Sequence, residues 1–264
     1  MYHFFYLVNI NNMKKILFTG ARSGIAKDVI DNLTHDYYIY MTVHTKIEEE
    51  RLKEEYKNIN NIEIFKLDVT SREDKEKIKD LELDILVLNA AIGYAGSILE
   101  LPIEKIKENY EVNVFANIEI IQKIVNKMLE KNKGKIIIVS SLAGIIPIPF
   151  MGSYCATKSS LIMFAKILKK ELKILKSKIK VKLILPGVYK TGFNEIMRNN
   201  KNEYIKKFKN QKNKIELNEK IIFDLLAKNN LETIRKEIIK AIVDKNNKFI
   251  YSAPISAKLI TKLY

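Results

Sequence analysis

The feature that most constrains this chain is a regular alternation of short apolar runs with longer amphipathic stretches. The runs are continuously apolar, which indicates strands buried on both faces of a parallel sheet. The stretches between them have the periodicity of helices. We therefore predict one α/β domain, a doubly wound parallel sheet with helices on both faces. The expected strands are Lys15–Thr19, Tyr37–Val43, Ile62–Leu67, Asp84–Leu88, Lys135–Ser140, Lys180–Leu185 and Lys248–Tyr251.

Two long helices are expected between the later strands, over Ile103–Lys131 and Ser153–Lys176. Residues 191–245 have a mostly helical pattern, and a substrate lid is expected at about 190–215. The run that begins at Met13 resembles a more natural start than Met1 does. We therefore predict an N-terminal extension over residues 1–12 and the folded domain over residues 13–264.

The strong positive charge of the chain raises the question of a nucleic-acid or membrane partner. The formal net charge is +15, but the lysines are spread along the whole length and form no nucleic-acid motif. We therefore predict no nucleic-acid binding. With one cysteine, Cys155, and no apolar run near the ~20 residues that span a bilayer, we expect a cytoplasmic protein.

The first predicted strand runs into a turn with two glycines, and a helix follows at once. Gly20 and Gly24 stand where a backbone must turn tightly and approach a pyrophosphate closely. The first amides of the next helix supply donors and partial positive charge for that anion. The turn therefore predicts a dinucleotide site in a Rossmann-type fold, with contacts from Gly20, Arg22, Ser23, Gly24 and Ile25.

The end of the second predicted strand carries basic residues and no acid. Enzymes that prefer NAD usually place Asp or Glu there to hold the ribose 2′-hydroxyl, and that carboxylate would repel a 2′-phosphate. In this chain Arg22, His44 and Lys46 could attract the phosphate instead. The pattern favours NADP(H) over NAD(H).

Tyr154 and Lys158 are four residues apart on a predicted helix, so their side chains share one face. An unperturbed tyrosine has a pKa of about 10, and a nearby ammonium group stabilises the phenolate and lowers that pKa. Ser141, which follows the fifth predicted strand, could hydrogen-bond a substrate oxygen and orient it. We predict that Tyr154 acts as a catalytic acid/base, tuned by Lys158 and assisted by Ser141.

These motifs, in this order, resemble the short-chain dehydrogenase/reductase family over about residues 13–252. Two alanines, Ala26 and Ala91, stand where the family usually has glycine. The resemblance implies hydride transfer between NAD(P)(H) and a carbonyl or alcohol, with reduction of a ketone or aldehyde favoured. It identifies Asn113 as the fourth catalytic residue, which holds a water of a proton relay. It also implies cofactor contacts from Asp68, Val69, Asn89, Ala90, Tyr154, Lys158, Pro186, Gly187, Val188 and Thr191.

The resemblance further implies a small-molecule carbonyl or alcohol substrate, no metal site, and a homodimer or homotetramer joined through the two long helices. The apolar segment Ile145–Met151 and Phe193 are consistent with an apolar or partly apolar carbonyl compound, and equally with packing of the loop itself. Near the chain end Ile255, Leu259, Ile260 and Leu263 share one side of a short helix, for which packing is favoured over contact with a membrane or subunit.

The competing hypothesis is a catalytically silent protein of the same fold, a dinucleotide-binding regulator or scaffold. Such a protein is expected to lack one of the four catalytic residues. All four, Asn113, Ser141, Tyr154 and Lys158, are present. The sequence therefore favours the enzyme.

Overall fold

The computed structural model describes residues 12–33, 37–199, 201, 204–211 and 227–263. Within them, seven strands form one sheet in the order β3-β2-β1-β4-β5-β6-β7, and every pair of neighbours is parallel. The expected parallel fold is therefore confirmed, with strand bounds within a few residues of the expected ones. The strands are β1 (Lys14–Phe18), β2 (Tyr37–Val43), β3 (Ile62–Lys66), β4 (Ile85–Leu88), β5 (Lys135–Val139), β6 (Lys180–Pro186) and β7 (Ile250–Ala253).

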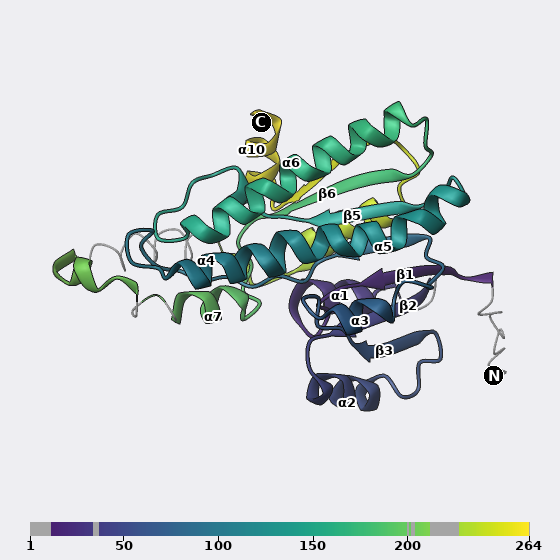
Figure 1. Ribbon diagram of the computed structural model, residues 1–264, viewed down its shortest axis with the longest axis horizontal. Helices are drawn as coiled ribbons and strands as arrows, with labels where there is room; N and C mark the ends of the chain where they lie inside the picture. The colour runs from purple at the N-terminus through teal and green to yellow at the C-terminus, as the bar shows by residue number, and fades with distance from the viewer. Residues whose placement is uncertain (1–11, 34–36, 200, 202–203, 212–226, 264) are drawn as a thin grey trace.

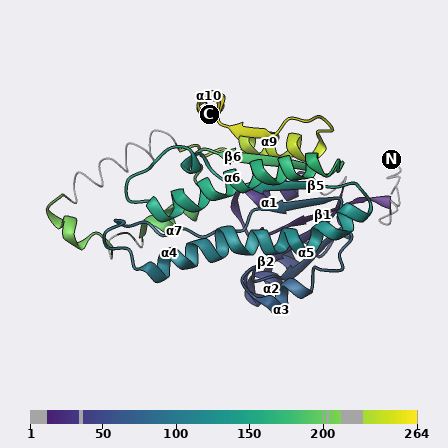
Figure 2. The ribbon, with the colours of Figure 1, turned by 45° about the horizontal axis from the view of Figure 1, so that its top comes forward.

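Helices cover both faces of this sheet, as Figures 1 and 2 show. On one face lie α1 (Gly24–Asp31), α2 (Lys46–Glu55) and α9 (Glu232–Val243), which bury side chains in one shared core cluster. The other face carries α5 (Ala116–Glu130) and α6 (Gly152–Ile174), which lie side by side. The short α3 (Arg72–Glu76) leads into Ile78, which is buried on that same face.

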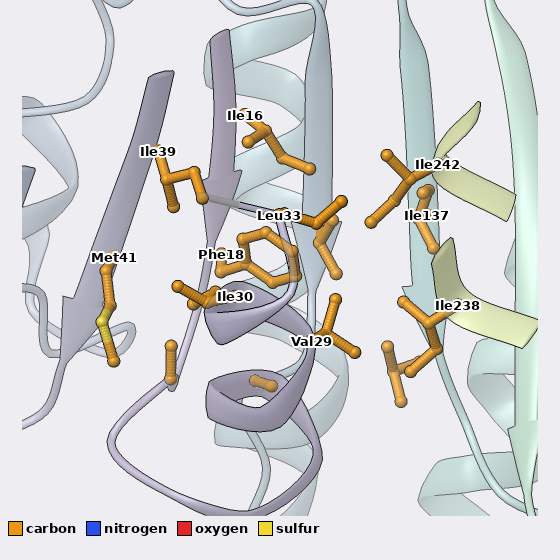
Figure 3. Packing of buried hydrophobic residues seen from close by; sticks show 14 of the residues in the cluster. Ile16, Phe18, Val29, Ile30, Leu33, Ile39, Met41, Ile137, Ile238 and Ile242 are labelled. Carbon is orange, nitrogen blue, oxygen red and sulfur yellow. The ribbon is translucent and has the colours of Figure 1, made fainter. Parts of the chain in front are cut away.

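The first core cluster holds β1 and β2 against α1 and α9. Phe18 and Ile30 lie at its centre, with Ile238 reaching in from α9 (Figure 3). Phe18 is 1% exposed and is among the largest fully buried side chains of the described residues. Residues of β1 alternate between the two clusters, because successive side chains of a strand point to opposite faces. The central strand thus joins both helical layers.

The expected helix over Ile103–Lys131 is interrupted in the structure. α4 (Ile103–Tyr110) and α5 are joined by η2, a π-helical turn over Glu111–Phe115. A π turn changes the direction of the side chains within it and is frequent at functional sites. The prediction of one uninterrupted helix was therefore wrong at the position of Asn113.

The last helix, α10 (Ile255–Leu263), packs only partly as expected. Ile255 and Leu259 are exposed, whereas Ala257 is fully buried. Ile260 faces a cavity instead of joining the same exposed side. The helix therefore packs against β7, as expected, but Ile255 and Leu259 take no part in that packing, and the Leu263 side chain lies outside the described residues. No helix among the described residues is long and apolar enough to span a membrane.

The structure describes only part of the expected substrate lid and of the chain termini. The expected lid contains α7 (Phe193–Asn199) and the 3-10 helix η5 (Lys206–Gln211). Residues 212–226 lie outside the described residues, as does all of the proposed N-terminal extension except Asn12. The boundaries of the extension and of the lid remain predictions.

The position of Phe18 leads to a prediction about stability. Replacing Phe18 with Ala would leave a cavity where β1 meets α1 and should lower the free energy of unfolding by about 3–5 kcal/mol. Ile47→Ala is the matched control, because Ile47 is 79% exposed and its loss should change stability by at most about 0.5 kcal/mol. Urea unfolding of both variants measures the difference; equal stabilities would contradict the assigned core.

Candidate active site

A cavity of about 790 Å³ opens beyond the carboxyl ends of the strands. Its volume falls within the range of roughly 300–1,000 Å³ that small-molecule sites occupy. All predicted site residues except Asn113 and Lys46 line it, so residues that are far apart in the sequence meet at one place. They are Gly20, Arg22, Ser23, Gly24, Ile25, His44, Asp68, Val69, Asn89, Ala90, Ser141, Tyr154, Lys158, Pro186, Gly187, Val188 and Thr191.

The turn between β1 and α1 requires glycine for two separate reasons. Gly20 and Gly24 both have φ of +63°, a conformation that glycine adopts without strain. A Cβ on Gly20 would also stand 2.7 Å from the Cα of Ala90. Ser23 precedes α1 without capping it through its side chain, which leaves the first amides of the helix available to an anion. The turn therefore fits the pyrophosphate of a dinucleotide.

Thr19 and Asn89 fasten this turn to the end of β4. The Thr19 hydroxyl oxygen accepts hydrogen bonds from the amides of Asn89 and Ala90, at 2.9 and 3.0 Å. The Asn89 side-chain nitrogen donates to the carbonyl oxygens of Thr19 and Gly20, at 3.2 and 2.9 Å. Asn89 is thus a strand tie, as its place at the strand end indicated. Gly20 and Ala90 are held at contact distance on the wall of the cavity.

The three basic side chains expected at the ribose end each have an acidic partner. Arg22 pairs with Glu48 at 2.7 Å, Lys46 pairs with Glu49 at 2.9 Å, and His44 Nε2 lies 3.5 Å from a carboxylate oxygen of Asp68. The end of β2 contains no acid, but helix α2 brings carboxylates back to it. The Thr45–Glu48 spacing of a capping box is a sequence signal for the return of Glu48, but it does not indicate the pairing with Arg22.

Tyr154 and Lys158 lie on α6, and both are buried against the cavity. The Lys158 ammonium nitrogen stands 5.6 Å from the centroid of the Tyr154 ring and donates to the Val139 carbonyl at 3.2 Å. Burial raises the pKa of Tyr154, and a hydrogen bond with Ser141 opposes that rise without cancelling it. Burial also lowers the pKa of Lys158 to about 8. Desolvation therefore outweighs the Ser141 hydrogen bond, and the phenol is held protonated. A lowering of the tyrosine pKa by Lys158 remains a prediction.

Asn113 lies inside the π turn and is fully buried. Its side-chain nitrogen donates to the Ile92 carbonyl and to the Thr157 hydroxyl, at 2.9 and 3.1 Å, and its oxygen accepts from the Ile92 amide at 2.8 Å. Thr157 in turn donates to the Tyr154 carbonyl at 2.8 Å. The side chain thus ties the loop after β4 to the helix of Tyr154. The relay water expected at Asn113 remains a prediction.

Two side chains of the lid cover Tyr154. The ring of Phe193 lies with its centroid 5.7 Å from that of Tyr154. Met197 is 1% exposed, and Tyr154, Met151 and Met197 share a small apolar cluster. Sequence reasoning identified Phe193 but missed Met197 and Thr157. Only the helical spacing of Met197 from Phe193 could have indicated it.

Comparison with known proteins shows the family of the chain. Residues 14–202 match the short chain dehydrogenase family, and the chain belongs to it. An NADPH-dependent 3-dehydrocapnine reductase of Ornithobacterium rhinotracheale is 31% identical over 190 residues, which are 68% of this chain and 66% of that enzyme. A diacetyl reductase of Staphylococcus epidermidis is 30% identical over 67% of this chain and 72% of its own length. The protein is thus an NAD(P)-dependent oxidoreductase of this family.

Solved structures show the same fold over nearly the whole chain. A short chain dehydrogenase/reductase of Burkholderia phymatum, in complex with NAD, superposes with a TM-score of 0.79. The match covers 94% of this chain and 92% of that one, at 17% sequence identity. The Rossmann-type fold is therefore confirmed, and the finer assignments depend on the residues of this chain.

The close approach of Gly20 to Ala90 leads to a prediction about binding. In Gly20→Ala the added Cβ meets the Ala90 backbone, and the left-handed conformation alone costs about 1–2 kcal/mol. We expect the affinity for NAD(P)(H), measured by calorimetry, to fall at least about tenfold. Gly152→Ala is the control, because its Cβ would stand 3.7 Å from Ile98, an ordinary contact. Unchanged affinity in Gly20→Ala would rule out the turn as the dinucleotide cradle.

Proposed function

We propose that this protein reduces a ketone or aldehyde with NADPH and that Tyr154 donates the proton. The observation that carries the proposal is that Tyr154, Lys158 and Ser141 line the same cavity as the turn from Gly20 to Gly24, called the glycine turn below. A dinucleotide whose pyrophosphate lies on that turn can extend along the cavity toward these side chains. When bound, NADPH supplies the hydride that the carbonyl carbon receives.

The residues around Tyr154 have complementary roles in the proton transfer. The raised pKa keeps the phenol protonated, which is the state that can give a proton to the developing alkoxide. The Ser141 hydroxyl, hydrogen-bonded with Tyr154, orients the carbonyl oxygen. Lys158 stabilises the phenolate that remains, since its ammonium group is close and both groups are shielded from water. Asn113 positions the helix of Tyr154 through Thr157.

The substrate is proposed to be an apolar carbonyl compound. The cavity wall near Tyr154 consists mostly of aliphatic and aromatic side chains, with few polar groups to bind a charged substrate. The relatives named above reduce 3-dehydrocapnine and diacetyl, so carbonyl reduction is common to both. The apolar wall comprises Ile146, Ile148, Met151, Phe193 and Ile196.

NADP(H) is proposed as the preferred cofactor. Arg22 and His44 line the cavity at the end of β2, where the ribose of a bound dinucleotide would lie. The relative from Ornithobacterium rhinotracheale is named as NADPH-dependent. A cytoplasmic location, expected from the single cysteine, remains a prediction.

Self-association through the long helices is also proposed. Phe115 in η2 and Met163, Phe164 and Ile167 on α6 are each at least 42% exposed. Such a concentration of large apolar side chains on adjacent helices is typical of a surface that a partner covers. A homodimer or homotetramer built on this surface would remove these residues from water.

The central test of the proposed function is Tyr154→Phe. Loss of the hydroxyl removes the proton donor while it keeps the ring that packs on Phe193. We expect carbonyl reduction, followed as NADPH oxidation over a panel of apolar ketones, to fall at least about a thousandfold. NADPH affinity should remain within about threefold of the wild type. Retained turnover in the variant would disprove the mechanism. Tight binding without turnover in the wild type would favour the catalytically silent alternative.

The low pKa of Lys158 predicts the alkaline side of the pH profile. Lys158 is a cation below its pKa of about 8 and neutral above it, whereas the Tyr154 phenol stays protonated throughout this range. We expect kcat/KM for reduction to decline as pH rises through about 8. In Lys158→Arg the guanidinium keeps its charge, so any residual activity should lose this decline. A decline at the same pH in that variant would exclude Lys158 as its source.

A further inference from the structure

The Glu48 side chain connects the glycine turn with the residues that follow β2. Helix α2 begins after Thr45, and Glu48 folds back over its first turn in a capping box. One carboxylate oxygen accepts the amides of His44 and Thr45 at 3.1 and 3.2 Å. The other accepts the guanidinium of Arg22 at 2.7 Å. The Glu48 carboxylate thus holds one guanidinium and two backbone donors at once.

These donors are the groups that a 2′-phosphate would need. A dinucleotide seated on the glycine turn places its adenosine ribose at the end of β2, where Arg22 and His44 line the cavity. A phosphate on that ribose would compete with the Glu48 carboxylate for the same donors and would be repelled by its charge. An unsubstituted 2′-hydroxyl carries no charge, so the carboxylate does not repel it.

The Glu48 carboxylate is well held in this place. Its side chain is 15% exposed, compared with 53% for Arg22. Burial would raise the pKa of Glu48, but the hydrogen bonds from Arg22, Thr45 and His44 keep that pKa below its ordinary value. The carboxylate is therefore ionised at neutral pH. Arg51, which donates to the Arg22 carbonyl at 3.1 Å, is itself paired with Glu55.

We infer that Glu48 determines cofactor specificity in this chain and keeps the preference for NADP(H) over NAD(H) small. The carboxylate ties up Arg22 and the amides of His44 and Thr45, so a 2′-phosphate gains little from them. The inference rests on the proposed function only in assuming that the cavity binds a dinucleotide. No residue of β2 itself contributes this acid; it comes from the third position of the following helix.

The substitution Glu48→Gln tests this role without dismantling the helix start. Glutamine also satisfies a capping box through its amide oxygen, so the fold of α2 is retained while the negative charge is lost. Glu50→Gln is the matched control: Glu50 is exposed on the same helix, and its loss changes the net charge equally. Thermal unfolding of both variants verifies that they are folded.

Dissociation constants for NADPH and NADH, measured by calorimetry on each protein, give the result. For the wild type and Glu50→Gln we expect NADPH to bind less than about tenfold more tightly than NADH. In Glu48→Gln, NADPH affinity should rise about five- to tenfold, while NADH affinity stays level or falls slightly. Adding Arg22→Ala to Glu48→Gln should cancel that rise, because the released guanidinium is its source.

The outcomes separate this inference from the proposed function. If both dinucleotides bind but their affinity ratio is the same in Glu48→Gln and Glu50→Gln, the role of Glu48 is disproved and the proposed function stands. A wild-type preference for NADPH above about a hundredfold would also disprove it. If neither dinucleotide binds the wild type, the proposed function fails and this inference fails with it.

Discussion

The hydrogen bonds between Thr19 and Asn89 fasten the turn after β1 to the end of β4, and the rest of the site depends on this contact. The sheet order β3-β2-β1-β4 means that the chain leaves β1 and β4 in opposite directions, so a crevice opens between their carboxyl ends. The Thr19 hydroxyl accepts two amides across this crevice, and the Asn89 amide donates to two carbonyls in return. This exchange keeps the Gly20 turn against Ala90. The proposed pyrophosphate site and the proposed catalytic side chains then line one cavity.

Burial determines the chemistry at the other end of the cavity. Tyr154 and Lys158 are both shielded from water, and burial moves their pKa values in opposite directions, toward the neutral form of each. A protonated phenol beside a readily titrated ammonium group suits proton donation in the direction of reduction. The lid contributes to this state, because Phe193 and Met197 pack over the tyrosine ring. The side chains that pack on Tyr154 therefore also shield the proposed proton donor from water.

Much of the fold was predictable because its signals are local and repeated. Continuous apolar runs marked the strands, and the glycines of the first turn marked a left-handed backbone that glycine adopts without strain. The order of the motifs in the sequence was also enough to predict that Ser141, Tyr154 and Lys158 lie together, and all three line the cavity. These inferences succeeded because each rests on spacing within one element or on the edge where parallel strands end.

The remaining features depend on contacts between elements that sequence spacing does not report. The helical pattern over Ile103–Lys131 gave no sign of the π turn, in which Asn113 bonds with Ile92 and Thr157. The basic residues near β2 indicated a phosphate site, but Glu48 reaches back to them from α2. The raised pKa of Tyr154 could not be foreseen either, because it follows from burial under a lid.

The central claim is that this cavity passes a hydride from a bound dinucleotide to a carbonyl carbon. The most direct measurement follows the hydrogen itself, using NADPH carrying deuterium at the transferable position of its nicotinamide and a panel of apolar ketones. The account predicts a product alcohol one mass unit heavier, with deuterium on the former carbonyl carbon. Tight NADPH binding with no deuterium in any product would contradict it and indicate a protein that binds the dinucleotide without using it.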